Sequence, residues 1–180
     1  MTEKTKLAIV YGSTREGRLC DAVVAWTVAQ IEADGRYDII RIDPARGESY
    51  EAVSRRLDAA DAFLVVTPEY NHSFPAPLKE LVDAYGTEWH AKPVAFISYG
   101  GISGGLRAVE HLRGVFAELH TVSIRDTVSF AGAWKRFGPD GMLRDAAGAE
   151  RSMKTLLSRL HWWAAALSKA RNAIQFGEAA

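Results

Sequence analysis

Short apolar runs alternate along the chain with stretches in which apolar residues recur every three or four positions. The apolar runs predict five strands, at 6–11, 37–43, 62–67, 93–99 and 121–125. The helical spacing predicts helices that begin near residue 19 and end at 33–35, then cover 50–61, 77–86, 105–120 and 153–167. This alternation indicates an α/β protein with a mostly parallel sheet and helices on both faces.

The chain is expected to form a single domain over residues 1–180, because it shows no repeat, low-complexity tract or linker. Residues 131–148 contain the turn sequence "FGPDGM" and are expected to form a long surface loop or flap.

The composition gives no support for a nucleic-acid or membrane partner. Lys+Arg and Asp+Glu both number 22, so no overall charge favours nucleic acid or an anionic membrane. The one cysteine, Cys20, rules out an internal disulfide framework, and the five histidines show no metal-binding spacing, so no metal is expected. With neither an apolar leader nor an 18-residue apolar span, the sequence suggests a cytoplasmic protein that does not enter the membrane.

Three connections are candidate ligand-binding loops, because ligands of open parallel sheets bind at the carboxyl ends of the strands. The first, "GSTREGR", joins a strand to a helix start, where free backbone N–H groups and the helix dipole favour anions. Gly12 permits a turn, Ser13 and Thr14 add hydroxyl groups, and Arg15 and Arg18 can bind phosphate oxygens in pairs. This favours a phosphate site over the alternative, a solvated turn with both arginines in water.

The other two connections can form the walls of a site for a flat ligand. The segment 67–77 contains three prolines and the sequence "PEYNHSFP", so it is expected to be stiff, although Pro75 and Pro77 also suit the start of a helix. The third connection, "GGISGG", has few side chains and lets a planar ligand approach backbone N–H groups.

Together, "GSTREGR", "TPEYNHSFPAPLKELVD" and "SYGGISGG" resemble the motifs of the NADPH-dependent FMN reductase family of the flavodoxin-like superfamily, which includes small quinone and azo-dye reductases. The resemblance runs from about Leu7 to Leu119 and is most specific in the middle motif. It implies a flavodoxin-like three-layer α/β fold, a five-stranded parallel sheet of order 2-1-3-4-5, and non-covalent FMN at the carboxyl edge.

The resemblance also implies cofactor contacts. Ser13, Arg15 and Arg18 are expected to hold the FMN phosphate, with backbone contact from Leu19 or Cys20. Many relatives have serine at the position of Arg18, so this second cation either tightens phosphate binding or meets the phosphate of a nicotinamide cofactor. The flavin ring is expected to contact Pro68, Glu69, Tyr70, Asn71, Ser98, Tyr99, Gly100, Gly101 and Gly104.

The implied activity is that of an FMN-dependent oxidoreductase. Hydride from NADPH or NADH passes through FMN to a quinone, an azo dye or free flavin by a ping-pong mechanism. Because hydride transfer needs no side-chain acid or base, no catalytic residue is assigned, and Tyr70, Asn71 and Tyr99 are candidates by position only. The backbone N–H groups of Gly100 and Gly101 are expected to stabilise negative charge on the reduced ring.

Two other functions remain open from the sequence. One is a non-enzymatic electron carrier of flavodoxin type, although such carriers usually need a strongly acidic docking face. The other is a flavin-binding structural or sensory module without turnover. Cys20 could be a redox thiol at a helix start, but a packed small residue is the favoured interpretation.

The aromatic residues suggest self-association. Trp89, Trp134 and Phe137 are expected near the ligand edge, and a helix can bury only one of the adjacent Trp162 and Trp163. Members of the family are homodimers, so a homodimer or homotetramer is expected, with the helices after the third and fourth strands at the interface. The alternative is that these aromatic residues complete the core of the monomer.

Overall fold

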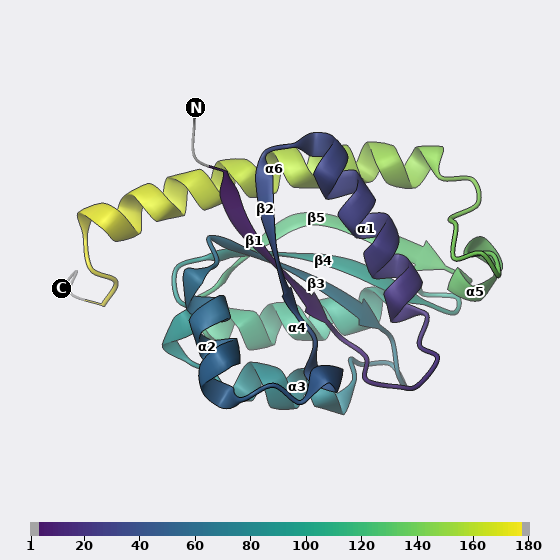
Figure 1. Ribbon diagram of the computed structural model, residues 1–180, viewed down its shortest axis with the longest axis horizontal. Helices are drawn as coiled ribbons and strands as arrows, with labels where there is room; N and C mark the ends of the chain where they lie inside the picture. The colour runs from purple at the N-terminus through teal and green to yellow at the C-terminus, as the bar shows by residue number, and fades with distance from the viewer. Residues whose placement is uncertain (1–3, 178–180) are drawn as a thin grey trace.

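The centre of the molecule is one parallel sheet (Figure 1). The computed structural model describes residues 4–177. Its strands are β1 (Thr5–Tyr11), β2 (Tyr37–Ile42), β3 (Ala62–Pro68), β4 (Pro93–Gly100) and β5 (Val122–Ala131). They lie in the order β2-β1-β3-β4-β5 and every neighbouring pair is parallel, which confirms the predicted sheet.

Helices cover both faces of this sheet, so the molecule has three layers (Figure 1). Two helices, α1 (Cys20–Asp34) and α6 (Ala147–Ala173), pack against one face. The opposite face is covered by α2 (Tyr50–Ala59), α3 (Ala76–Asp83) and α4 (Leu106–Glu118). Short turns of helix are η1 (Pro44–Arg46), η2 (Thr87–Trp89) and α5 (Ala133–Arg136).

Two of the three inner strands, β3 and β4, correspond to the most apolar runs of the sequence. Every residue of β3 and β4 is buried, because helices cover both of their faces. Within the described residues, no helix combines the length and the apolar character that a membrane span needs.

The fifth strand is longer than predicted. It continues to Ala131 rather than ending at Arg125. Ser123 pairs with Val94 and Thr127 pairs with Phe96, so residues 124–126 bulge opposite a single residue of β4. The charged residues Arg125 and Asp126 lie in this bulge. They interrupt the apolar run, so the sequence pattern did not predict that the strand continues. The segment predicted as a loop or flap also contains α5 and an isolated bridge between Phe137 and Leu143.

Some expectations for the aromatic residues were wrong. Trp89 precedes β4, at the edge opposite the predicted ligand loops, and is fully buried between Phe63 and Phe116. Phe137 is buried against Phe130, so it also completes the core of the monomer.

Neither of the adjacent tryptophans of α6 is buried, although a helix could bury one of them. Trp162 is 63% exposed and Trp163 is 37% exposed. The buried stripe of this helix is formed instead by Met153, Leu156, Leu157, Leu160 and Ala164. Its C-terminal half extends past the sheet in Figure 1, so less of it is covered.

Candidate cofactor site

The loops after β1, β3 and β4 meet at the carboxyl edge of the sheet. β2 lies on one side of β1 and β3 lies on the other, so the strand order reverses beside β1. Ligands of open parallel sheets bind at such a point. Glycine at position 12 allows the end of β1 to lie close to β3, because a Cβ atom there would lie 2.8 Å from the Cα of Thr67. A larger residue would therefore force β1 and β3 apart.

The N-terminus of α1 fits an anion. The N–H groups of Thr14, Leu19 and Cys20 donate to no other backbone group within residues 4–177. They lie at the start of a 15-residue helix, whose dipole places partial positive charge there. Arg15 is exposed beside them. This set of donors matches the needs of a phosphate group.

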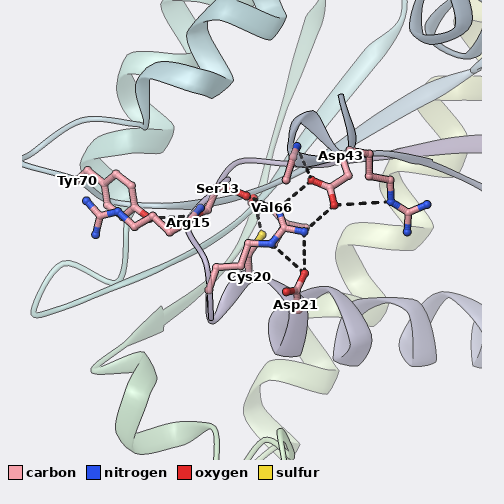
Figure 2. A network of polar contacts seen from close by, with 10 residues as sticks. Ser13, Arg15, Cys20, Asp21, Asp43, Val66 and Tyr70 are labelled. Atoms are coloured by element: carbon pink, nitrogen blue, oxygen red, sulfur yellow. Dashed lines mark hydrogen bonds and ion pairs between the residues drawn. The ribbon is translucent and has the colours of Figure 1, made fainter. Parts of the chain in front are cut away.

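Tyr70 connects the first loop to the second. Its hydroxyl group lies 2.9 Å from Ser13 Oγ, and its ring lies under the Arg15 guanidinium at 3.8 Å. Figure 2 shows these three side chains on one side of the loop, with Asp43 and Asp21 on the other. The expected phosphate residues Ser13 and Arg15 therefore do lie together.

The second loop forms a tight hairpin whose central residues are Asn71 and His72. Tyr70 and Ser73 exchange backbone hydrogen bonds of 2.9 and 3.0 Å, and both central residues have positive φ angles, 49° and 69°. Such angles are typical of a type I′ turn, which asparagine tolerates well. The turn places both central residues at an exposed tip.

Glu69 connects the second loop to the third. Its carboxylate accepts hydrogen bonds from Ser103 Oγ at 2.6 Å, the backbone N–H of Arg107 at 3.2 Å and the Arg107 guanidinium at 2.6 Å. Burial by itself raises the pKa of this carboxyl, but these partners outweigh burial and lower the pKa. Glu69 is thus an ionised link between the two walls of the site.

Two hydroxyl groups, one from β4 and one from β5, hold the glycine-rich loop after β4. Ser98 and Ser129 both donate to the carbonyl oxygen of Gly104, at 2.8 and 2.9 Å. The loop is open at Gly101, since a Cβ atom there would meet only the Trp134 ring, at 3.8 Å. The Gly101 N–H donates to no backbone group among the described residues, so it is available to a ligand.

Tyr99 and Cys20 lie in the core rather than in the site. Tyr99 is 5% exposed and Cys20 is fully buried, and they neighbour each other. Burial raises the pKa of both the Cys20 thiol and the Tyr99 hydroxyl. The buried thiol fits the packing role favoured for Cys20, and these residues can offer a ligand only backbone groups.

Arg18 points away from Arg15, toward the end of β2. Its guanidinium forms a bidentate pair with Asp43 at 2.6 and 2.8 Å and also contacts Asp21 (Figure 2). The hydrogen bond to Asp43 and, to a smaller extent, that to Asp21 raise the pKa of Arg18. Burial raises the pKa of Asp43, but Arg18 and the N–H of Ala45 outweigh it and lower that pKa.

Exposed residues of all three loops, Arg15, Asn71 and Ile102, line this edge of the sheet, which we call the shelf. A cavity of about 560 Å³ borders it at Thr14 and extends between Asp43 and Tyr85. A larger cavity, about 1470 Å³, lies at the opposite edge of the sheet, beside Thr5 and His161. An open shelf leaves one face of a bound ring accessible to other molecules.

Three supporting residues were not identified from the sequence: Asp43, Ser103 and Arg107. Asp43 directly follows β2 at the same sheet edge, and this position could have revealed it. Ser103 and Arg107 flank the start of α4, but a partner 34 or 38 residues away carries no local signal.

Known proteins resemble this chain in both sequence and fold. Residues 5–135 match the family of NADPH-dependent FMN reductases. The chain belongs to this family. An NAD(P)H-dependent FMN reductase of Schizosaccharomyces pombe is 31% identical over 120 residues, covering 56% of this chain and 60% of the relative. An NADPH:quinone oxidoreductase of Arabidopsis thaliana is 39% identical over 114 residues, covering 60% and 58%.

The chain matches about three fifths of the length of these curated relatives. Among solved structures, the flavoenzyme NAD(P)H:acceptor oxidoreductase FerB of Paracoccus denitrificans superimposes with a TM-score of 0.66, at 23% identity, covering 88% of this chain and 97% of FerB. A flavodoxin mutant of Pseudomonas aeruginosa gives a TM-score of 0.59 at 22% identity, covering 91% and 99%. These likenesses establish the flavodoxin-like fold.

Proposed function

We propose that the protein is an FMN-dependent NAD(P)H oxidoreductase that reduces quinones, and that azo dyes and free flavin are further acceptors. The observation that carries this proposal is the meeting, at one sheet edge, of the anion-binding start of α1 with two loops that can flank a flat ring. Membership of the family supports it.

We infer the following roles for the chain. Ser13, Arg15 and the N–H groups of Thr14, Leu19 and Cys20 bind the phosphate of FMN. The ring lies between the two walls that Glu69 links, and its contacts come from Pro68, Glu69, Tyr70, Asn71, Ser98, Tyr99, Gly100, Gly101 and Gly104, through backbone atoms where the side chain is buried. The free Gly101 N–H supports a role for this group in stabilising negative charge on the reduced ring.

The bound FMN would supply the redox chemistry, accepting hydride from NADPH or NADH and returning the electrons to the acceptor in a second half-reaction. The open shelf supports a ping-pong order, because one accessible face can serve both partners in turn. Initial rates measured at several fixed quinone concentrations should then give parallel double-reciprocal lines, whereas intersecting lines would contradict this order.

The basic test is reconstitution. Protein incubated with excess FMN and then desalted should be yellow and hold one FMN per chain, and anaerobic stopped-flow mixing with NADPH or NADH should bleach it as fast as turnover. Protein that retains no FMN would refute the proposal. Protein that retains FMN but is not reduced by either nicotinamide would instead be an electron carrier of flavodoxin type.

We also propose that two or four copies associate in the cytoplasm, through α3 and α4. Apolar side chains beside the shelf support this: Ile102 is 94% exposed and Leu106 is 49% exposed, at the start of α4. Light scattering coupled to gel filtration should give a mass of two or four chains, and Leu106→Glu should reduce it to one. A monomeric wild-type protein would refute the association.

A further inference from the structure

All three nitrogen atoms of the Arg18 guanidinium already donate hydrogen bonds within the protein. Nε and Nη2 lie 3.0 and 2.9 Å from Asp21 Oδ1, and Nη1 and Nη2 donate to the two oxygens of Asp43 at 2.8 and 2.6 Å. Nη1 also donates to the backbone carbonyl of Ser13. A guanidinium has five N–H groups. Four of them form hydrogen bonds, and the nitrogen that carries the fifth, Nη2, is already held between the two carboxylates.

The charges around Arg18 also disfavour a direct contact with phosphate. Its side chain is 10% exposed and that of Asp43 is 8% exposed, so the pair is shielded from water. A phosphate that approached this guanidinium would meet the Asp43 and Asp21 carboxylates as well. Arg15 lies on the far side of Ser13, over the Tyr70 ring, and faces no such carboxylate pair (Figure 2).

The hydrogen bond from Arg18 to the Ser13 carbonyl oxygen indicates a role in orienting the backbone of the loop. All peptide bonds in the described chain are trans, so the N–H of Thr14 points away from the carbonyl of Ser13. By holding that carbonyl toward β2, Arg18 turns the Thr14 N–H to the opposite side of the loop. Asp43 follows β2 and accepts a hydrogen bond from the backbone N–H of Ala45. This carboxylate therefore holds the Arg18 side chain in place.

We propose that Arg18 is a positioning residue that acts through Asp43, in place of the expected direct contact with the FMN phosphate. Together they fix the Ser13–Thr14 peptide so that its N–H group can bind the phosphate. This inference rests on the proposed function, since it requires FMN to bind at the loop after β1.

A double-mutant cycle separates the two roles of Arg18. The variants are Arg18→Ala, Asp43→Ala and the double variant, and the measurement is FMN affinity by quenching of flavin fluorescence. If Arg18 acts through Asp43, each single variant weakens FMN binding about tenfold or more, to a similar extent, and the double variant is no weaker than either.

A direct phosphate contact gives a different pattern. Asp43→Ala would then leave FMN affinity unchanged or improve it, because it frees a cation, while Arg18→Ala would weaken it. That pattern overturns the inference, as does an Arg18→Ala variant with wild-type affinity. If the alanine variants do not fold, Arg18→Lys and Asp43→Asn replace them: lysine keeps the charge without the bidentate geometry, so wild-type FMN affinity in Arg18→Lys overturns the inference.

Riboflavin and a second ion pair serve as controls. Riboflavin lacks the phosphate, so its affinity should change less than twofold in Arg18→Ala, and an equal loss for both flavins would indicate general damage and overturn the inference. Arg36 and Asp34 form a similar bidentate pair at the other end of β2, at 2.7 and 2.6 Å. Arg36→Ala and Asp34→Ala should leave FMN affinity within twofold.

These experiments distinguish failure of the proposed function from failure of this inference alone. If wild-type protein binds no FMN, the proposed function and this inference fall together. If wild-type protein binds FMN and the cycle gives the pattern of a direct contact, only the inference falls.

Discussion

The Arg15 guanidinium lies 3.8 Å from the centre of the Tyr70 ring, while the hydroxyl group of the same tyrosine reaches Ser13. The loops after β1 and β3 are therefore tied together by a cation–π contact and one hydrogen bond. An exposed contact of this kind contributes about 0.5–1 kcal/mol, which is less than a charged hydrogen bond to phosphate. These two contacts help to order the loops.

Arg15→Ala should weaken FMN binding about 10- to 150-fold, because a hydrogen bond to a charged group contributes about 1.5–3 kcal/mol. Riboflavin binding should hardly change. The measurement is flavin fluorescence quenching, and the matched control is Arg55→Ala, which removes an exposed arginine from α2. Unchanged FMN affinity in Arg15→Ala would remove this residue from the phosphate site.

Tyr70→Phe keeps the ring under Arg15 but removes the hydroxyl group that contacts Ser13. The free energy of unfolding should fall by about 0.5–1.5 kcal/mol, the usual value of one hydrogen bond. FMN affinity should stay equal or rise, because the Ser13 hydroxyl becomes free for the phosphate. Urea unfolding and FMN titration measure the two effects. A tenfold loss of FMN affinity would mean that the hydroxyl itself contacts the cofactor.

Apolar periodicity predicted the strands and helices well because the physical cause is local. The runs that became β3 and β4 are buried on both faces, and their composition records this directly. The order of the strands came from the family resemblance rather than from periodicity, since pairing is not a local property. Ser13, Arg15 and Tyr70 were grouped correctly, because strand topology brings their loops together.

The direction of individual side chains was not predictable in the same way. Arg18 and Arg15 look equivalent in the sequence, but Asp43 draws one of them to the other side of the loop. Tyr99 was a candidate flavin contact by position, although the alternation of a strand turns its ring into the core beside Cys20. Such outcomes depend on partners far along the chain.

Glu69→Gln should lower the free energy of unfolding at pH 7 by about 1–3 kcal/mol, because a charge-assisted link to Ser103 and Arg107 is weakened. The pKa of Glu69 is lowered from its usual 4.5 in the folded protein. The stabilisation is therefore complete above pH 4.5 and is lost as the pH falls through the lowered pKa. Urea unfolding of both proteins at pH 7, 5 and 3.5 should show the difference shrinking at the lowest pH. A constant difference would mean that ionisation is unimportant.

Cys20 should react slowly with thiol reagents in the native protein, because the thiol is fully buried and burial raises its pKa. The rate with Ellman's reagent should rise by orders of magnitude in guanidinium chloride. Cys20→Ala should keep NAD(P)H-dependent quinone reduction, since no step of the proposed reaction uses the thiol. Rapid labelling of native protein, together with loss of activity, would instead support a redox role.

Lys92 should make the stability of the protein depend on alkaline pH. Its side chain is buried, and Nζ donates to the carbonyl oxygens of Leu57 and Asp58 at 2.9 and 2.8 Å, at the end of α2. Burial lowers the pKa of Lys92 from its usual 10.5 to about 8. Between these two values the unfolded chain binds a proton that the folded protein does not, so stability rises with pH.

Compared with Lys92→Met, the wild-type protein should therefore gain about 1.4 kcal/mol of unfolding free energy per pH unit between pH 8 and 10.5. Using the difference between the two proteins cancels the titration of all other groups that the substitution leaves undisturbed. Urea unfolding at pH 7, 8, 9 and 10 measures it. A difference that stays constant over this range would mean that the folded protein keeps Lys92 charged, with its two carbonyl partners outweighing the cost of burial.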